Sequence, residues 1–147
     1  MSKATLVAAS LSFIAQPLAF ADVRFIDEQA VIKAIHAPIL KQVKEEDSPG
    51  CMTTRYTFGD KVFDMKLEFK CDRINVAWTG SDDPKNKARV INATVLAKKA
   101  VSALTDGSGI EVERVLSGGI YKSRTFDNGL VLRSGSCAMN ACLLTFN

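Results

Sequence analysis

Four cysteines give this chain its clearest chemistry, and their spacing indicates disulfide bonds rather than a metal site. They are Cys51, Cys71, Cys137 and Cys142. A zinc site is disfavoured because there is no Cys-x-x-Cys pair and only one histidine to complete the ligands. The missing Cys-x-x-Cys motif also argues against a thioredoxin-like redox centre. An even number of cysteines in a small exported domain is instead typical of a disulfide framework.

The spacing favours two local disulfides over the other connectivities. If the two residues midway between Cys137 and Cys142 form a hairpin turn, these cysteines face each other at a position without cross-strand hydrogen bonds. Cα atoms stand about 4.5 Å apart at such positions, which a disulfide can span. Cys51 and Cys71 flank a second predicted hairpin almost symmetrically. We therefore expect Cys51–Cys71 and Cys137–Cys142, which either only staple the fold or, in the tight second loop, form a redox-switching pair.

A second set of residues combines positive charge with an aromatic ring, as expected of a binding patch. Its members are Lys122, Arg124, Phe126 and Arg133. If Asn128-Gly129 and Gly118-Gly119 are two-residue hairpin turns, Arg124 faces both Arg133 and Glu113 on the neighbouring strands. Two opposed arginines are unfavourable unless a carboxylate or another anion lies between them. Either Glu113 supplies that carboxylate in a solvated charge ladder, or the patch binds an acidic partner or ligand.

The remaining titratable residues do not form a recognisable catalytic set. His36 is the only histidine, and there is no Gly-x-Ser-x-Gly element, His-Glu-x-x-His motif or phosphate-binding glycine loop. Carboxylates that could pair for hydrolysis are Asp60, Asp64, Glu68, Asp72, Asp82 and Asp83. Asp64 and Glu68 alternate with Lys66 and Lys70, which is typical of a solvated strand face. We therefore expect no catalytic residue, cofactor or metal.

Hydrophobic periodicity predicts the elements that position these residues. Helices are expected over 27–44 and from 81–84 to about 104, and strands over 51–58, 63–69, 74–79, 110–116, 120–126, 130–137 and 142–146. Pro38 should kink or break the first helix near Ala37. The predicted order α-β-β-β-α-β-β-β-β indicates a single α+β domain with a mostly antiparallel sheet, two helices and two local disulfides.

The N-terminal residues have the pattern of a secretory signal peptide. Lys3 precedes an apolar stretch at 6–14, Gln16-Pro17 breaks any helix, and Ala19-Phe20-Ala21 has the small-x-small form that signal peptidase recognises. We therefore expect residues 1–21 to be cleaved and residues 22–147 to form one exported domain in the periplasm or outside the cell. No cysteine starts the mature chain, so we expect no lipid anchor and no stable membrane anchor. The style of the signal suggests a bacterial source.

The net charge of the chain excludes some classes of partner but leaves several functions open. Removing Lys3 from nineteen basic residues leaves eighteen against sixteen acidic ones. A net charge of +2 is too balanced for nucleic acid or an anionic membrane as the main partner.

The leading hypothesis is a small exported binding protein without a catalytic centre. It would be an inhibitor, an immunity-type protein or an accessory factor of an envelope or secretion system. Its partner would be another protein or an acidic envelope ligand. The alternatives are an envelope hydrolase that uses carboxylates, and an assembly subunit joined through a free edge strand such as 142–146.

The cleavage prediction can be checked by intact-mass analysis of the protein made in its native host. The mass should correspond to a chain that starts at Asp22, because the small-x-small site ends at Ala21. Recovery of residues 1–21 on the protein in a membrane fraction would contradict the assignment.

Overall fold

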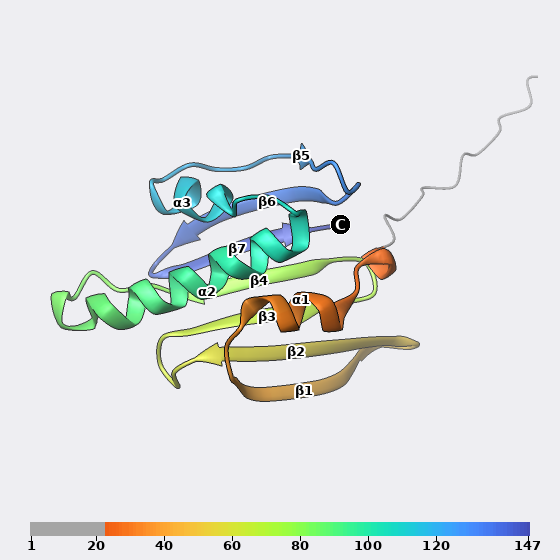
Figure 1. Cartoon of the computed structure of the whole chain (residues 1–147), viewed down its shortest axis with the longest axis horizontal. Coiled ribbons are helices and arrows are strands. Elements are labelled where there is room, and N and C mark those ends of the chain that lie inside the picture. Colours follow the sequence, from red (N-terminus) through yellow and green to blue (C-terminus); the bar gives the residue numbers. More distant parts are fainter. Residues whose placement is uncertain (1–22) are drawn as a thin grey trace, which may run out of the picture.

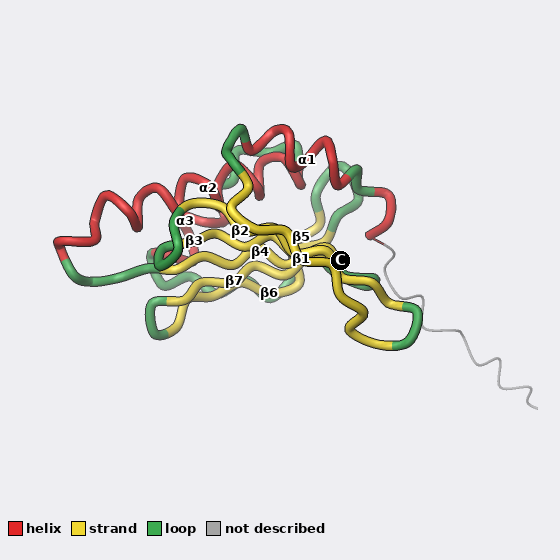
Figure 2. The backbone as a smooth tube through the Cα atoms, turned by 90° about the horizontal axis from the view of Figure 1, so that it is seen from below, coloured by secondary structure: helices red, strands yellow, loops and turns green. Residues whose placement is uncertain are grey.

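The described helices cover one face of a seven-stranded antiparallel sheet, and none of them lies on the other face (Figures 1 and 2). The computed structural model describes residues 23–147, and the predicted signal peptide lies outside them. The strands are β1 (Ile39–Ser48), β2 (Cys51–Gly59), β3 (Asp64–Phe69), β4 (Ile74–Thr79), β5 (Arg124–Thr125), β6 (Val131–Ala138) and β7 (Ala141–Phe146). The α+β class with an antiparallel sheet is therefore confirmed.

The strand order places the last strand inside the sheet. The order is β1-β2-β3-β4-β7-β6-β5, so β1 to β4 form a meander and β7 pairs with β4. The expectation that 142–146 is a free edge strand is therefore wrong. The edges are β1 and β5, because β7 is hydrogen-bonded on both sides, to β4 and to β6.

The first helix is shorter than predicted, and a strand takes its second half. Helix α1 (Glu28–Ile35) ends at His36, whose φ of 49° is left-handed, and β1 starts directly after Pro38. The predicted break is confirmed, but the continuation of the helix to residue 44 is wrong. Pro38 has no N–H for a helix and disfavours the helical conformation of Ala37. The chain beyond it pairs with β2 instead.

The segment expected as a strand at 110–116 is helix α3 (Ile110–Leu116). Its buried residues Glu111, Val112 and Val115 fall on one helical face. The helix ends at Gly118-Gly119, where Gly118 has a φ of 87° and the Gly119 N–H donates to the Arg114 carbonyl. These glycines therefore terminate a helix rather than turn a hairpin. The strand expected at 120–126 is reduced to a bridge at Tyr121 and the two residues of β5.

Helix α2 (Lys87–Thr105) lies over the centre of the sheet, as Figure 1 shows. Its predicted start is confirmed, since a short 3-10 turn begins at Pro84 and the Asp83 side chain accepts the Lys85 N–H. Ala93, Ala97 and Ala100 are completely buried. Their small side chains let the helix backbone approach the strands closely, which creates a continuous core between the two layers.

Both predicted disulfides are present and use all four cysteines. Cys51–Cys71 ties the start of β2 to the loop after β3, with Cα atoms 5.7 Å apart. Cys137 and Cys142 face each other in the β6–β7 hairpin, with Cα atoms 4.0 Å apart. The turn between them has left-handed backbone at both central residues, as the two-residue hairpin prediction requires. Within residues 23–147, no helix is long and apolar enough to cross a membrane.

Gly135 in β6 allows α3 to lie close to the sheet, and its replacement should destabilise the protein. A Cβ at this position would overlap Leu144 Cδ2 and come within 3.2 Å of Val115 Cγ1. Leu144 is completely buried and has no room to move away. We expect Gly135→Ala to lower the free energy of unfolding by about 1–3 kcal/mol.

Urea denaturation followed by circular dichroism measures this change. Gly80→Ala is the matched control, because its nearest heavy atom, the Asn140 carbonyl oxygen, would lie 3.6 Å from the new Cβ. Equal stability of the two variants would contradict the close packing at Gly135.

Candidate functional site

The structure separates the two arginines that were expected to face each other. Arg124 pairs with Leu132, and Arg133 occupies an irregular position in β6 between Leu132 and Ser134. The predicted register is wrong because the loop at Asn128-Gly129 is longer than two residues and closes through the hydrogen bond from the Phe126 N–H to the Leu130 carbonyl. The predicted ladder of directly opposed cations therefore does not form.

A buried carboxylate neutralises Arg124. Its Nη1 donates to Glu111 Oε1 at 2.5 Å, and Glu111 is only 2% exposed. The guanidinium also lies 4.8 Å from the centre of the Phe126 ring, a distance at which cation–π attraction acts. Glu113, the predicted partner, instead pairs with Lys98 of α2. The contact between Arg124 and Glu111 holds the short β5 segment against α3.

All three cations of the predicted patch are exposed, but Arg124 is paired with the Glu111 carboxylate. Arg133 Nε donates to Asn147 Oδ1 at 2.8 Å, an uncharged partner, so its positive charge is retained. Phe126 is 9% exposed and offers little ring surface to a ligand. We call the surface around Lys122 and Arg133 the cationic corner. Its binding role stays a prediction, which rests on these two residues more than on Arg124.

A larger surface is the face of the sheet that no described helix covers, here called the open face. Its residues are Arg55, Thr57, Asp64, Lys66, Glu68, Asn75, Ala77, Thr79, Leu143 and Thr145. They occupy the alternating positions of β2, β3, β4 and β7 whose side chains do not enter the core. The alternating acids and lysines of β3 predicted this solvated face, but the sequence did not indicate its extent across neighbouring strands.

A row of hydrogen-bonded polar side chains crosses four strands of the open face. Arg55 of β2 pairs with Glu68 of β3, Asn75 of β4 donates to Glu68 Oε2 at 3.0 Å, and Thr145 of β7 donates to Asn75 Oδ1 at 3.1 Å. Burial alone would raise the pKa of Glu68, but the hydrogen bonds from Asn75 and Arg55 outweigh it and lower that pKa. The row is therefore held in place before any partner arrives.

The neighbouring row of the open face is smaller and more apolar. Thr57, Lys66, Ala77 and Leu143 are directly opposed across the same four strands. Leu143 is 43% exposed, although it belongs to an interior strand. The small side chains of Thr57 and Ala77 would let another surface approach the backbone of the sheet closely there, whereas Lys66 between them adds a positive charge.

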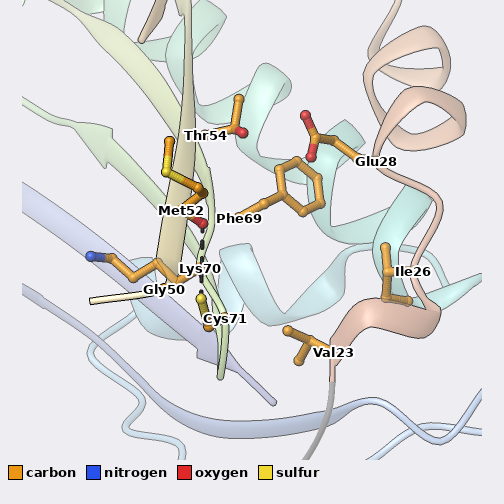
Figure 3. Close-up of a pocket in the computed structure, with 9 residues that line it drawn as sticks. All are labelled: Val23, Ile26, Glu28, Gly50, Met52, Thr54, Phe69, Lys70 and Cys71. Carbon is orange, nitrogen blue, oxygen red and sulfur yellow. Dashed lines mark hydrogen bonds between the residues drawn. The ribbon is translucent and has the colours of Figure 1, made fainter. Parts of the chain in front are cut away.

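On the other side of the sheet, a cavity of about 620 Å³ separates the start of the described chain from the ends of β2 and β3 (Figure 3). Its lining is mixed, with the apolar residues Val23, Ile26 and Phe69 beside the polar residues Thr54 and Lys70. Glu28 contributes a carboxylate, but Oε1 accepts the Tyr56 hydroxyl at 2.5 Å. Burial, and secondly this hydrogen bond, raise the pKa of Tyr56. The cavity has the size of a ligand site, but its one carboxylate already has a partner.

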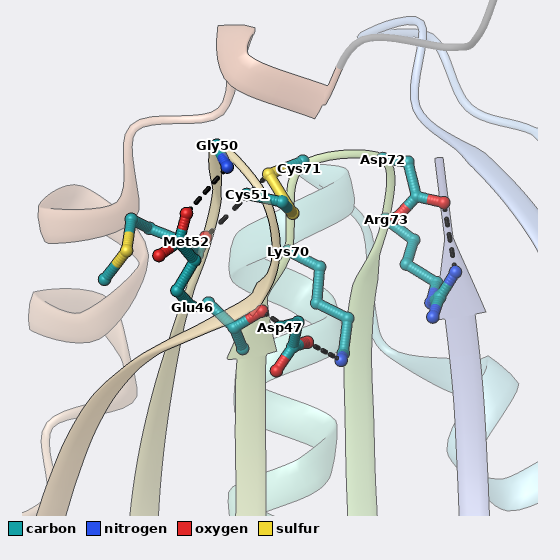
Figure 4. The surroundings of a disulfide bond; sticks show 10 residues. Glu46, Asp47, Gly50, Cys51, Met52, Lys70, Cys71, Asp72 and Arg73 are labelled. Carbon is teal, nitrogen blue, oxygen red and sulfur yellow. Dashed lines mark hydrogen bonds and ion pairs between the residues drawn. A yellow bond between two sulfur atoms is a disulfide. The ribbon is translucent and has the colours of Figure 1, made fainter.

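The charged residues around the Cys51–Cys71 bond have hydrogen-bond or ion-pair partners nearby in the chain or in the adjacent loop (Figure 4). Asp47 pairs with Lys70 and accepts the Thr53 hydroxyl at 2.7 Å, and these contacts lower the pKa of Asp47. Glu46 accepts the Gly50 N–H at 2.7 Å. This end of the β1–β2 hairpin is therefore a structural staple with its own charge network.

Two of the carboxylates considered for hydrolysis, Asp60 and Asp64, have structural partners. Asp60 accepts two hydrogen bonds from Arg89 and the N–H groups of Val62 and Phe63, and the pKa of Asp60 is lowered by Arg89 first and by these amides next. Asp64 accepts the Thr79 hydroxyl at 3.2 Å. Among the residues that the structure describes, no three metal-binding side chains gather in one place.

In comparisons with known proteins, the chain matches no family model, no curated protein and no solved structure. The corner at Lys122 and Arg133, the open face and the cavity are therefore weighed on their geometry alone. The open face is the broadest of the three, since it spans four central strands.

The buried position of Glu111 predicts a measurable role for Arg124 in stability. We expect Arg124→Ala to lower the free energy of unfolding by about 1–3 kcal/mol, because it leaves a buried carboxylate without its cation. This range is below that for a fully buried pair, since the Arg124 side chain is 42% exposed and partly screened by water.

Urea denaturation of Arg124→Ala and Arg133→Ala provides the comparison. Arg133→Ala is the control and should cost less than about 0.5 kcal/mol, because its partner Asn147 is uncharged. An equally small effect for Arg124→Ala would show that Glu111 does not depend on this cation.

Proposed function

We propose that this chain is a small exported binding protein that recognises a protein partner with the open face of its sheet. The observation that carries the proposal is that the helices lie on one side of the sheet. Helices α1 and α2 cover one face (Figure 2), and α3 packs against α2 and β6 on the same side. The other face offers a broad surface of mostly polar side chains. Such a surface would serve an inhibitor, an immunity-type protein or an accessory factor of an envelope or secretion system.

The order of the side chains supports binding by the open face. Arg55, Glu68, Asn75 and Thr145 hold one another through hydrogen bonds across four strands. A surface fixed in this way loses little conformational entropy when a partner binds, which favours affinity. Leu143 adds an apolar contact beside the polar row. This arrangement suits a protein partner better than a small molecule, because small ligands prefer concave sites.

Location in the periplasm or outside the cell belongs to the same proposal. The pattern of residues 1–21 supports export, and two disulfides are typical of proteins in an oxidising compartment. The style of the signal supports a bacterial source. An acidic envelope ligand at Lys122 and Arg133 is the second candidate, supported by the retained charge of Arg133.

Partner capture with surface variants tests the proposal. The tagged full chain, expressed with export in its native host, is recovered from envelope and culture fractions together with what it retains. We expect a stoichiometric protein partner, and we expect Leu143→Arg to reduce its capture at least tenfold, because a long cation would stand in the middle of the contact. Ile91→Arg on α2 is the matched control, since Ile91 is 52% exposed on the helical layer, and it should leave capture unchanged.

Two other results would contradict the open face as the binding site. If Lys122→Glu combined with Arg133→Glu abolishes capture while Leu143→Arg does not, the cationic corner is the site. Capture at this corner should also weaken as salt rises, because salt screens exposed charges. Turnover of a peptide or glycan library without any retained partner would favour the hydrolase alternative.

A further inference from the structure

Strand β1 is a ten-residue edge of the sheet with nothing described beyond it (Figure 1). Nine of its residues are exposed, and only Val43 is half-buried. One side of the strand pairs with β2, so the backbone N–H and C=O groups of its outer side have no strand partner in the described chain. Such an edge is a template for pairing with another strand.

The central part of β1 is regular enough for further pairing. Its register with β2 is interrupted between Ile39 and Lys41 and again between Glu46 and Ser48, but runs without a shift from Lys41 to Glu46. Irregular positions bend a strand and end its pairing. Val43 lies near the middle of the uninterrupted stretch, so a second strand centred there would meet only regular backbone.

The side chains of β1 alternate between the two faces of the sheet. Gln42 reaches the Tyr56 hydroxyl at 3.2 Å on the side covered by helices, whereas Glu45 pairs with Arg55 on the open face. By alternation, Lys41, Val43 and Glu45 therefore share the open face. Lys41 and Glu45 stand two residues before and two residues after Val43, and their charges are opposite.

We propose that two copies of this chain pair through β1, antiparallel and about a two-fold axis at Val43, to form one continuous fourteen-stranded sheet from two seven-stranded ones. In this register Lys41 of each copy faces Glu45 of the other, so two opposite-charge pairs flank two meeting valines. Gln42 of each copy faces Lys44 of the other without conflict. β-branched pairs and opposite charges at directly facing positions both stabilise antiparallel sheets.

Charge selects this register over its neighbours. The open faces of the two copies lie on the same side of the joint sheet only if the two-fold axis passes through a residue of β1 and not between two residues. The alternative registers therefore place the axis at a neighbouring residue. An axis at Lys44 would place Lys44 opposite its own copy, and an axis at Glu45 would do the same for Glu45. An axis at Gln42 would place Lys41 opposite Val43 and lose both charge pairs. The axis at Val43 alone combines two attractive pairs with no like-charge pair.

Sedimentation velocity of the full chain, exported and processed as in the cell, tests the dimer over a wide range of protein concentration. Wild-type protein should dimerise. Lys41→Glu and Glu45→Lys should each raise the dissociation constant about tenfold or more, because each replaces two attractive pairs by two repulsive ones. An equimolar mixture of the two variants should form a heterodimer, since two carboxylates on one copy then face two ammonium groups on the other across the contact.

Lys44→Glu is the matched control, with the same charge change on the same strand but a neutral Gln42 opposite, and it should still dimerise. Circular dichroism confirms that every variant is folded. A monomer at all concentrations would overturn the proposal and would mean that the lysines of β1 protect the edge from pairing. Dimers that ignore both single substitutions, or a mixture that fails to associate, would also overturn it. The inference does not depend on which partner binds the open face.

Discussion

The fold depends on the pairing of β4 with β7. Nearly every other contact between strands joins neighbours in the sequence, whereas Asn75 and Thr145 meet although 70 residues separate them. This ladder joins the meander β1–β4 to the C-terminal hairpin and gives α2 a continuous sheet to cover. It also completes the open face, because the polar row and the smaller row beside it both cross from β4 to β7. A contact of such long range carries a loop-closure cost that the alanine face of α2 and the core beneath it must offset.

The sequence predicted correctly those elements that are determined by interactions between residues close together in the chain. The hairpin β2–β3, strand β4, the start of α2 and both disulfides depend on alternation, capping and spacing within about twenty residues. Two segments were misassigned because tertiary contacts outweigh their local pattern. Residues 39–44 continue a helical spacing of apolar residues, yet an adjacent strand offers them hydrogen bonds that Pro38 denies to a helix. Residues 110–116 become α3 because Val112 and Val115 gain a place in the core.

The candidate sites show the same limit. Arg124 and Arg133 were identified from charge and spacing, but the partner of Arg124 could not be, since a buried Glu111 follows only from the helical assignment of its segment. The open face depends on which strand neighbours β4, and periodicity carries no information on strand order. With the proposed pairing through β1, two open faces would lie side by side on one sheet. A partner with repeated binding surfaces would then gain avidity from contacting both copies.

The interior position of β7 has a consequence for the order of events in the cell. A sheet whose middle is filled by residues 141–146 cannot close while those residues are still in the ribosome. The meander β1–β4 can form early, but α2 would then rest on an incomplete sheet and leave Val76 and Trp78 without their β7 neighbours Leu144 and Cys142. The sheet of an emerging chain of this design stays incomplete until β7 has been made. If the chain is exported as proposed, that delay suits a translocation channel, because such a channel threads unfolded polypeptide.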